Sequence, residues 1–170
     1  SWIRPGAGCV AQYDKIHRFD VDLGVESHRE SNTYLPGQKA VLVDEGGFRF
    51  GLTICFDMRF SHLYRGLARR GAHVFMVPAA FTRPTGKAHW EVMLRSRAIE
   101  HGSYVIACGQ TGEHEDGRAT WGHSMVVGPW GEVILDMGEE EGLGFATLDM
   151  VQVQQARQKV PTLRLARSFD

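Results

Sequence analysis

The segment that most constrains the fold is an apolar run over residues 48–54 that ends at Cys55. The run has the length of a buried strand, and apolar residues at helical spacing follow it over residues 60–70. A strand that meets a helix in this way places a thiol beside unpaired backbone N–H groups, whose partial positive charge favours the thiolate. Cys55 is therefore a candidate nucleophile, although a free cysteine is often only a small buried hydrophobe.

The remaining elements expected along the chain alternate between hairpins, helices and loops. Hairpins with Gly-containing turns are expected over residues 40–54 and 123–135. Single strands are expected over residues 73–77, 104–108 and 143–148. Helices are expected over residues 60–70, 89–101 and 150–160, the last capped by Asp149. Loops are expected over residues 17–38, 79–87 and 111–121. This mixed order favours an α/β (α+β) fold with a sheet covered by helices on one face.

Composition excludes several classes of function. The formal net charge is −1 and no block of Lys and Arg occurs, which argues against a nucleic-acid partner. No apolar run approaches the roughly 20 residues that cross a bilayer, so no membrane partner is expected. Three cysteines without a CxxC pair argue against a disulfide framework, and a reducing cytoplasm is the expected location. The run His114-Glu115-Asp116 has metal-ligand types but lacks a typical ligand spacing, so neither a metal nor another cofactor is expected.

Cys55, Lys15 and Glu30 together have the chemistry needed to hydrolyse an amide. A thiolate attacks the carbonyl, a cation holds the developing oxyanion, and a carboxylate handles protons. Lowering the pKa of a cysteine by about two units yields only a severalfold net gain in reactivity, because the nucleophile weakens as its basicity falls. A positioned oxyanion donor raises kcat by a factor of about 10²–10³. Lys15 is therefore expected to act chiefly on the oxyanion.

Several segments around these residues resemble the nitrilase superfamily of carbon–nitrogen hydrolases. The matching segments lie at residues 13–17, 19–20, 30–31, 36–37, 51–60, 85–86, 88–91, 95–100, 122–131 and 160–164. Within that superfamily they are most similar to the deaminated-glutathione amidase branch, with the omega-amidase branch close behind. The resemblance implies an αββα sandwich and a homodimer or larger homo-oligomer.

The resemblance also assigns roles to individual residues. Cys55 matches the nucleophile, Lys15 the lysine, and Glu30 the second glutamate, which positions that lysine and the substrate. Lys15 and the backbone N–H of Phe56 would hold the oxyanion. The family's general-base glutamate lies upstream of the lysine, so residues 1–170 are expected to be a single domain that is incomplete at its N-terminus. Ser61 and His62 stand where the family has Pro-Glu.

The expected substrate is a small amide that carries a carboxylate, similar to deaminated glutathione. Arg59 presents a planar fork that suits such a carboxylate, but a structural ion pair with Asp57 or another acid is an equal alternative. Phe81 and Thr82 follow a strand end, where pockets often form, and are expected to bind substrate unless they only pack the loop.

Three alternatives remain open at this stage. The chain could be a catalytically inactive fragment or an interaction module, because a sheet without its first strands exposes an edge and an apolar face. It could have omega-amidase or another carbon–nitrogen hydrolase specificity. A thiol redox protein is disfavoured by the lack of a CxxC pair or an obvious resolving cysteine.

Cys108 lies in an apolar strand and is expected in the core.

Overall fold

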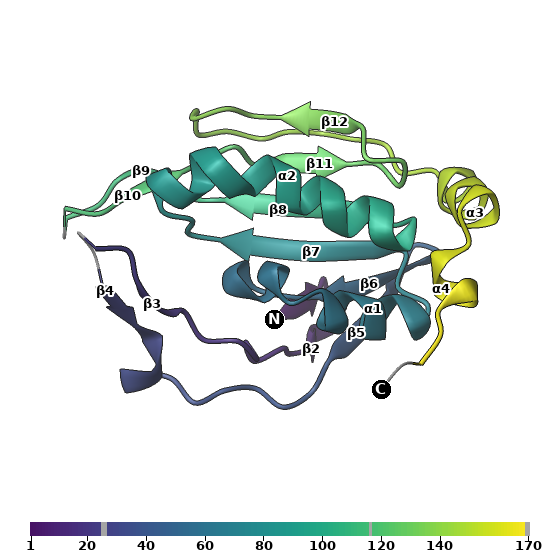
Figure 1. Ribbon diagram of the computed structural model, residues 1–170, viewed down its shortest axis with the longest axis horizontal. Coiled ribbons are helices and arrows are strands. Elements are labelled where there is room, and N and C mark those ends of the chain that lie inside the picture. Colours follow the sequence, from purple (N-terminus) through teal and green to yellow (C-terminus); the bar gives the residue numbers. More distant parts are fainter. Residues whose placement is uncertain (25–26, 116, 169–170) are drawn as a thin grey trace.

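A six-stranded sheet organises the computed structural model, which describes residues 1–24, 27–115 and 117–168 (Figure 1). Its strand order is β12-β11-β8-β7-β6-β5. The strands are β5 (Val41–Glu45), β6 (Phe48–Leu52), β7 (Val74–Ala79), β8 (Tyr104–Gly109), β11 (Met125–Val127) and β12 (Val133–Asp136). Strands β6, β7 and β8 run parallel, while the flanking pairs are antiparallel. Because parallel strands end at the same edge, the loops after β6, β7 and β8 meet there.

Helices α1 (Ser61–Arg69) and α2 (Arg83–His101) join the three parallel strands and cover one face of the sheet (Figure 1). The core between the two layers contains fully buried Leu67, Phe75 and Leu94. The expected helix over 60–70 and the expected hairpin over 40–54 are confirmed. Helix α2 begins six residues before the expected position 89, because Pro84 in its first turn favours a helix start rather than a loop.

The opposite face of the sheet is only partly covered. Phe48, Phe50 and Ile106 are half-buried there, and helix α3 (Met150–Lys159) packs Val153 against one end. Asp149 caps α3 as expected, because its side chain accepts the Val151 N–H at 2.9 Å. The chain ends in a short helix α4 (Thr162–Leu165). Among the described residues, one six-stranded sheet is thus covered by one main helix layer.

The strand expected over residues 143–148 is absent from the structure. Leu143 and Phe145 are 88% and 87% exposed, and no described strand pairs with this stretch, of which Leu148 alone packs against the cluster around Val153. The two long loops expected over 17–38 and 111–121 contain short hairpins. The small elements are β1 (Trp2–Arg4), β2 (Gly8–Ala11), β3 (Asp20–Asp22), β4 (Ser27–Arg29), η1 (Glu30–Asn32), β9 (Thr111–Glu113) and β10 (Ala119–Trp121).

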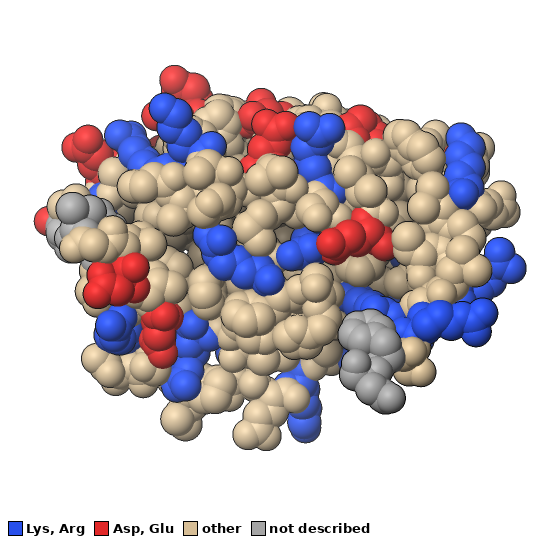
Figure 2. All heavy atoms as spheres, viewed as in Figure 1, with Lys and Arg blue, Asp and Glu red and all other residues tan. Residues whose placement is uncertain are grey.

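Acidic and basic side chains are interspersed on the face shown in Figure 2, as expected for a net charge near zero. Within the described part of the chain, no helix combines the length and apolar content that a bilayer crossing needs.

Candidate active site

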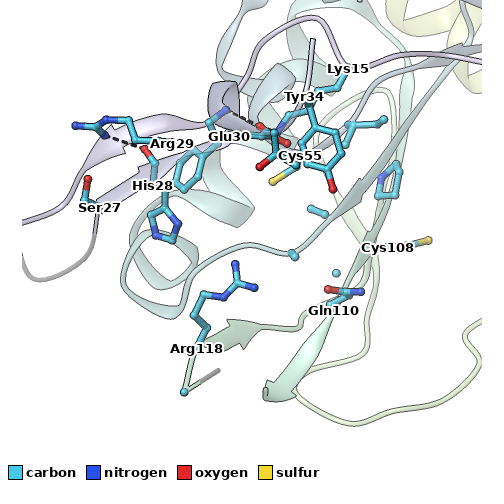
Figure 3. A pocket seen from close by; sticks show the side chains of 18 residues that line it. Lys15, Ser27, His28, Arg29, Glu30, Tyr34, Cys55, Cys108, Gln110 and Arg118 are labelled. Atoms are coloured by element: carbon cyan, nitrogen blue, oxygen red, sulfur yellow. Dashed lines mark hydrogen bonds and ion pairs between the residues drawn. The ribbon is translucent and has the colours of Figure 1, made fainter. Parts of the chain in front are cut away.

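A cavity of about 1200 Å³ opens at the edge where the parallel strands end (Figure 3). Cys55 follows β6, Ala80 follows β7 and Gln110 follows β8, and all three line the cavity. Lys15 and Glu30 reach the same cavity from segments that precede the sheet. The structure therefore brings together the three side chains that the sequence predicts to act on an amide.

Cys55 occupies an unusual backbone conformation. Its φ is +47°, in the left-handed region that non-glycine residues rarely adopt, and it begins a short 3₁₀ helix, η2 (Cys55–Arg59). Backbone hydrogen bonds from Ala80 and Phe56 reach the thiol. Such backbone strain is typical of functional sites, where the surrounding structure holds a side chain in one orientation.

Burial raises the pKa of the Cys55 thiol. The positive charge of Lys15 and the two backbone hydrogen bonds oppose this effect, while the negative charge of Glu30 adds to it. The Phe56 N–H at the helix start lowers the pKa of the thiol, as expected, but desolvation outweighs this effect and the net shift is upward. The thiol is predominantly neutral at pH 7 and must lose its proton during the reaction.

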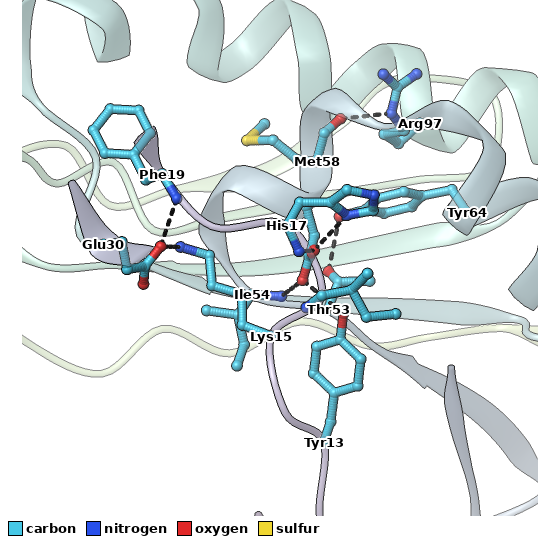
Figure 4. Close-up of polar contacts among 12 residues, drawn as sticks. Tyr13, Lys15, His17, Phe19, Glu30, Thr53, Ile54, Met58, Tyr64 and Arg97 are labelled. Atoms are coloured by element: carbon cyan, nitrogen blue, oxygen red, sulfur yellow. Dashed lines mark hydrogen bonds and ion pairs between the residues drawn. The ribbon is translucent and has the colours of Figure 1, made fainter. Parts of the chain in front are cut away.

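Lys15 and Glu30 form a half-buried ion pair, drawn in Figure 4, and Figure 3 shows this pair beside the Cys55 thiol. The distance from Lys15 Nζ to Glu30 Oε2 is 2.5 Å, and the same oxygen accepts the backbone N–H of Phe19 at 2.6 Å. The side chains of the pair are only 14% and 25% exposed. Glu30 is thus well placed to fix the direction of the lysine ammonium, since charged hydrogen bonds of this kind are strong and directional.

A fully buried carboxylate ties the lysine-bearing segment to the nucleophile loop. Asp57 Oδ2 accepts from the Tyr13 hydroxyl at 2.8 Å and from Ile54 N at 2.9 Å. Its Oδ1 accepts from His17 N at 3.0 Å and lies 2.8 Å from His17 Nδ1. These contacts converge in the centre of Figure 4. Sequence reasoning considered Asp57 only as a partner for arginine, because no periodic pattern reveals a long-range hydrogen-bond network.

Gly37 fixes the lysine segment from its other side. Its N–H donates to the carbonyl oxygen of Lys15 at 2.8 Å. A Cβ added at this glycine would lie 1.9 Å from the carbonyl oxygen of Asp14, so the close backbone approach requires glycine.

Comparisons with known proteins identify the family. The family model described as "Carbon-nitrogen hydrolase" matches residues 1–158. The chain belongs to the carbon–nitrogen hydrolase family. It is 46% identical over 165 residues to a deaminated glutathione amidase of Synechocystis, which covers 95% of this chain and 61% of the relative. It is 39% identical over 165 residues to human omega-amidase NIT2, with 96% and 60% covered. The chain thus spans about three fifths of these two relatives.

Solved carbon–nitrogen hydrolase structures share the fold. The NitFhit protein of C. elegans superposes with a TM-score of 0.86 at 42% identity, covering 92% of this chain and 39% of that one. An amidase mutant from Nesterenkonia superposes with a TM-score of 0.70 at 28% identity, covering 92% and 58%, and its title reports acrylamide added to the active-site cysteine. The mixed α/β fold and the resemblance to the carbon–nitrogen hydrolase family predicted from the sequence are therefore confirmed.

The three residues predicted to bind substrate lie outside the described lining of the cavity. The Arg59 guanidinium lies over the rings of Phe56 and Phe81, 5.8 and 5.5 Å from their centroids, and 3.2 Å from His89 Nδ1. Phe81 is buried, and Thr82 precedes α2. Packing, the alternative for Phe81, describes its buried position, whereas Arg59 stacks on aromatic rings instead of forming the ion pair with Asp57 that was its alternative. The role of all three residues in substrate binding stays a prediction.

Cys108 is not in the core, contrary to expectation. It is exposed and lines the cavity, because the alternation along β8 places it on the same face as Ile106, away from the helices. Gln110 and Arg118 also line the cavity and were missed. Arg118 lies in the expected loop over 111–121 and Gln110 directly precedes it, and the available signal was the position of Gln110 after a strand.

The run considered as a metal site does not assemble one among the described residues, where no group of three potential ligands occurs. His114 Nε2 lies 2.9 Å from the Thr120 hydroxyl, and Asp116 lies outside the described residues.

Proposed function

We propose that this chain carries the nucleophile of an amidase that hydrolyses the terminal carboxamide of a small carboxylate-bearing molecule. The observation that carries the proposal is the convergence of Cys55, Lys15 and Glu30 on one cavity at the carboxyl edge of the sheet. Ligand sites of open parallel sheets form at this edge. The amidase names of the relatives support the same class of reaction.

The proposed reaction proceeds through a thioester. The Cys55 sulfur attacks the carboxamide carbon as its proton leaves, giving a tetrahedral oxyanion. Collapse breaks the C–N bond, the nitrogen takes up a proton, and ammonia leaves. A water molecule then attacks the thioester carbon, and release of the acid returns the thiol.

Lys15 and the backbone N–H of Phe56 are the proposed oxyanion donors. The ammonium is fixed by Glu30 and shielded from water, which makes it more effective than a mobile surface lysine. One oxyanion donor contributes about 10²–10³ in kcat. Replacing Lys15 by methionine should therefore lower kcat by at least about a hundredfold.

Glu30 is proposed as a positioning residue rather than the base. Its Oε2 already accepts from Lys15 and from the backbone of Phe19, so protonation of this oxygen would cost both contacts. The base that takes the Cys55 proton is expected, from the family resemblance, to be a glutamate upstream of Lys15.

We propose a substrate of the deaminated-glutathione type, with an omega-amidase substrate as the second candidate. The support is the higher identity to the deaminated glutathione amidase of Synechocystis, 46% against 39% for human omega-amidase. The expected homo-oligomer and the expected cytoplasmic location stay predictions.

Ammonia release by the complete polypeptide tests the proposal. Wild type should release ammonia from a deaminated-glutathione-type carboxamide, and Cys55→Ala should release none. Cys9→Ala is the matched control, because Cys9 is exposed and outside the described lining of the cavity. Activity retained by Cys55→Ala contradicts the mechanism, and an inactive wild type favours the alternative of a catalytically inactive interaction module.

A further inference from the structure

One of the four tyrosines differs from the others in its surroundings. Tyr13, Tyr64 and Tyr104 are buried, and the hydroxyl of each is hydrogen-bonded. Tyr34 is 62% exposed, and its hydroxyl forms no hydrogen bond with any described residue. An aromatic ring with an unpaired polar end is typical of surfaces that bind another molecule.

Tyr34 lines the catalytic cavity, and its backbone is held on both sides. It follows η1, the short helix that carries Glu30, and its N–H donates to the Glu30 carbonyl oxygen at 3.0 Å. Arg18 Nη1 donates to the Tyr34 carbonyl oxygen at 3.3 Å. Figure 3 shows the ring of Tyr34 extending into the cavity. The anchored backbone therefore directs this side chain to the space that a substrate would occupy.

The Tyr34 hydroxyl is separate from the reacting groups of the site. No hydrogen bond joins it to Cys55, Lys15 or Glu30, whose own contacts are described above. The cavity of about 1200 Å³ also exceeds the roughly 300–1,000 Å³ typical of sites for drug-sized ligands. A carboxamide of a few carbon atoms against Cys55 would leave part of it unfilled, so the hydroxyl is available to a more remote part of a longer substrate.

Gln110 brings a second neutral polar group to the same cavity. Its side chain forms no hydrogen bond with a described residue, and it enters from the end of β8, whereas Tyr34 enters from the segment before the sheet (Figure 3). A hydroxyl and a carboxamide can each donate and accept a hydrogen bond without carrying charge. The secondary amide of a peptide has the same two capacities, while a hydrocarbon chain would leave both side chains without a partner.

We propose that Tyr34 determines specificity by donating a hydrogen bond to a secondary amide in the substrate chain, beyond the carboxamide that Cys55 attacks. The substrate class is then a terminal carboxamide whose chain contains a peptide-like amide. The Tyr34 hydroxyl donates to the amide carbonyl oxygen, Gln110 accepts from the amide N–H, and the tyrosine ring covers adjoining methylene groups. This inference rests on the proposed function, because it uses the same cavity.

A contact away from the reacting carbonyl is equally strong in the ground state and the transition state. It therefore lowers KM for a substrate with the secondary amide and leaves kcat unchanged. A substrate without that amide gains nothing from the hydroxyl, so Tyr34 sets specificity rather than rate.

Calorimetric titration of the complete polypeptide tests the binding step without turnover. The protein carries Cys55→Ala, and two ligands share the same terminal carboxamide: one has a secondary amide in its chain, and the other has a trans-alkene of the same length in its place. Tyr34→Phe should weaken binding of the amide ligand about three- to tenfold, the usual range for a neutral hydrogen bond, and leave the alkene ligand unchanged. Tyr34→Ala also removes the ring and should weaken both ligands.

Trp130→Phe is the matched control, because Trp130 is an exposed aromatic residue with a polar N–H and lies outside the described lining of the cavity. It should bind both ligands as the parent does. Equal affinities of the parent and Tyr34→Phe for the amide ligand overturn the inference, as does an equal loss for both ligands in Tyr34→Phe. Thermal unfolding shows whether each variant is folded.

Ammonia release from the matched pair of carboxamides separates this inference from the proposed function. With an active Cys55, Tyr34→Phe should raise KM about three- to tenfold for the amide-containing substrate alone, at unchanged kcat. If wild type releases ammonia but Tyr34→Phe treats both substrates alike, the subsite is overturned and the amidase function stands. If no ammonia is released but Tyr34→Phe selectively weakens the amide ligand, the amidase function fails and the subsite stands.

Discussion

Replacement of Asp57 by alanine should destabilise the fold strongly and separate the two segments of the site. The side chain is fully buried and accepts hydrogen bonds from Tyr13, His17 and Ile54. Alanine would leave the two backbone N–H groups and the tyrosine hydroxyl without their acceptor. Each hydrogen bond to a charged group contributes about 1.5–3 kcal/mol net, and these contributions are not additive. A total loss of about 3–5 kcal/mol is expected, a large part of the 5–15 kcal/mol typical of folded proteins.

Urea unfolding at pH 7 measures this loss in the complete polypeptide. Asp57→Asn keeps one carbonyl acceptor and should lose less stability than the alanine variant. Asp44→Ala is the control, because Asp44 is exposed and its ion pair with Arg49 lies in solvent, where such pairs contribute little. If Asp57→Ala lost no more stability than Asp44→Ala, the buried carboxylate would not be the structural link described above.

Three further predictions concern titration and backbone packing. Burial lowers the pKa of His101 to about 4, against about 6.5 unfolded, so stability should fall as pH drops from about 6.5 toward 4, by up to about 3 kcal/mol. His101→Met should flatten that decline in urea midpoints measured from pH 7 to 4, and an unchanged decline would refute the assignment. Burial raises the pKa of Cys55, so the rate of its alkylation, followed by peptide mass spectrometry, should rise with pH through an inflection above about pH 8.5. Lys15→Met should move this inflection higher still, because the positive charge of Lys15 lowers the pKa. An inflection below pH 7 would contradict the raised pKa. Gly37→Ala should displace the Lys15 backbone and lower kcat for ammonia release, whereas full activity would show that the close approach is dispensable.

The parts of the fold that sequence predicts best are those with local signals. The apolar run before Cys55 becomes β6, and the helical spacing after it becomes α1. Asp149 is a cap recognisable from its side chain alone. Lys15 and Glu30 were predicted as partners of the thiol because their chemistry is complementary and their segments resemble a known family, and the structure places the three together.

What sequence could not predict depends on contacts between distant segments. The expected strand over 143–148 is apolar enough, but no neighbouring strand pairs with it. The raised pKa of Cys55 follows from burial, which a local helix argument does not include. Arg118 reads as one charge in a charged loop, and only the folded chain places it in the cavity.

Trapping of the covalent intermediate tests whether Cys55 is the nucleophile. The complete polypeptide is mixed with a slowly hydrolysed terminal carboxamide, quenched in acid during turnover, digested, and examined by mass spectrometry. The peptide that contains Cys55 should gain the mass of the acyl group, hydroxylamine should remove it, and Cys55→Ala should show neither adduct nor ammonia. An acyl group on another residue, together with ammonia release by Cys55→Ala, would contradict the mechanism.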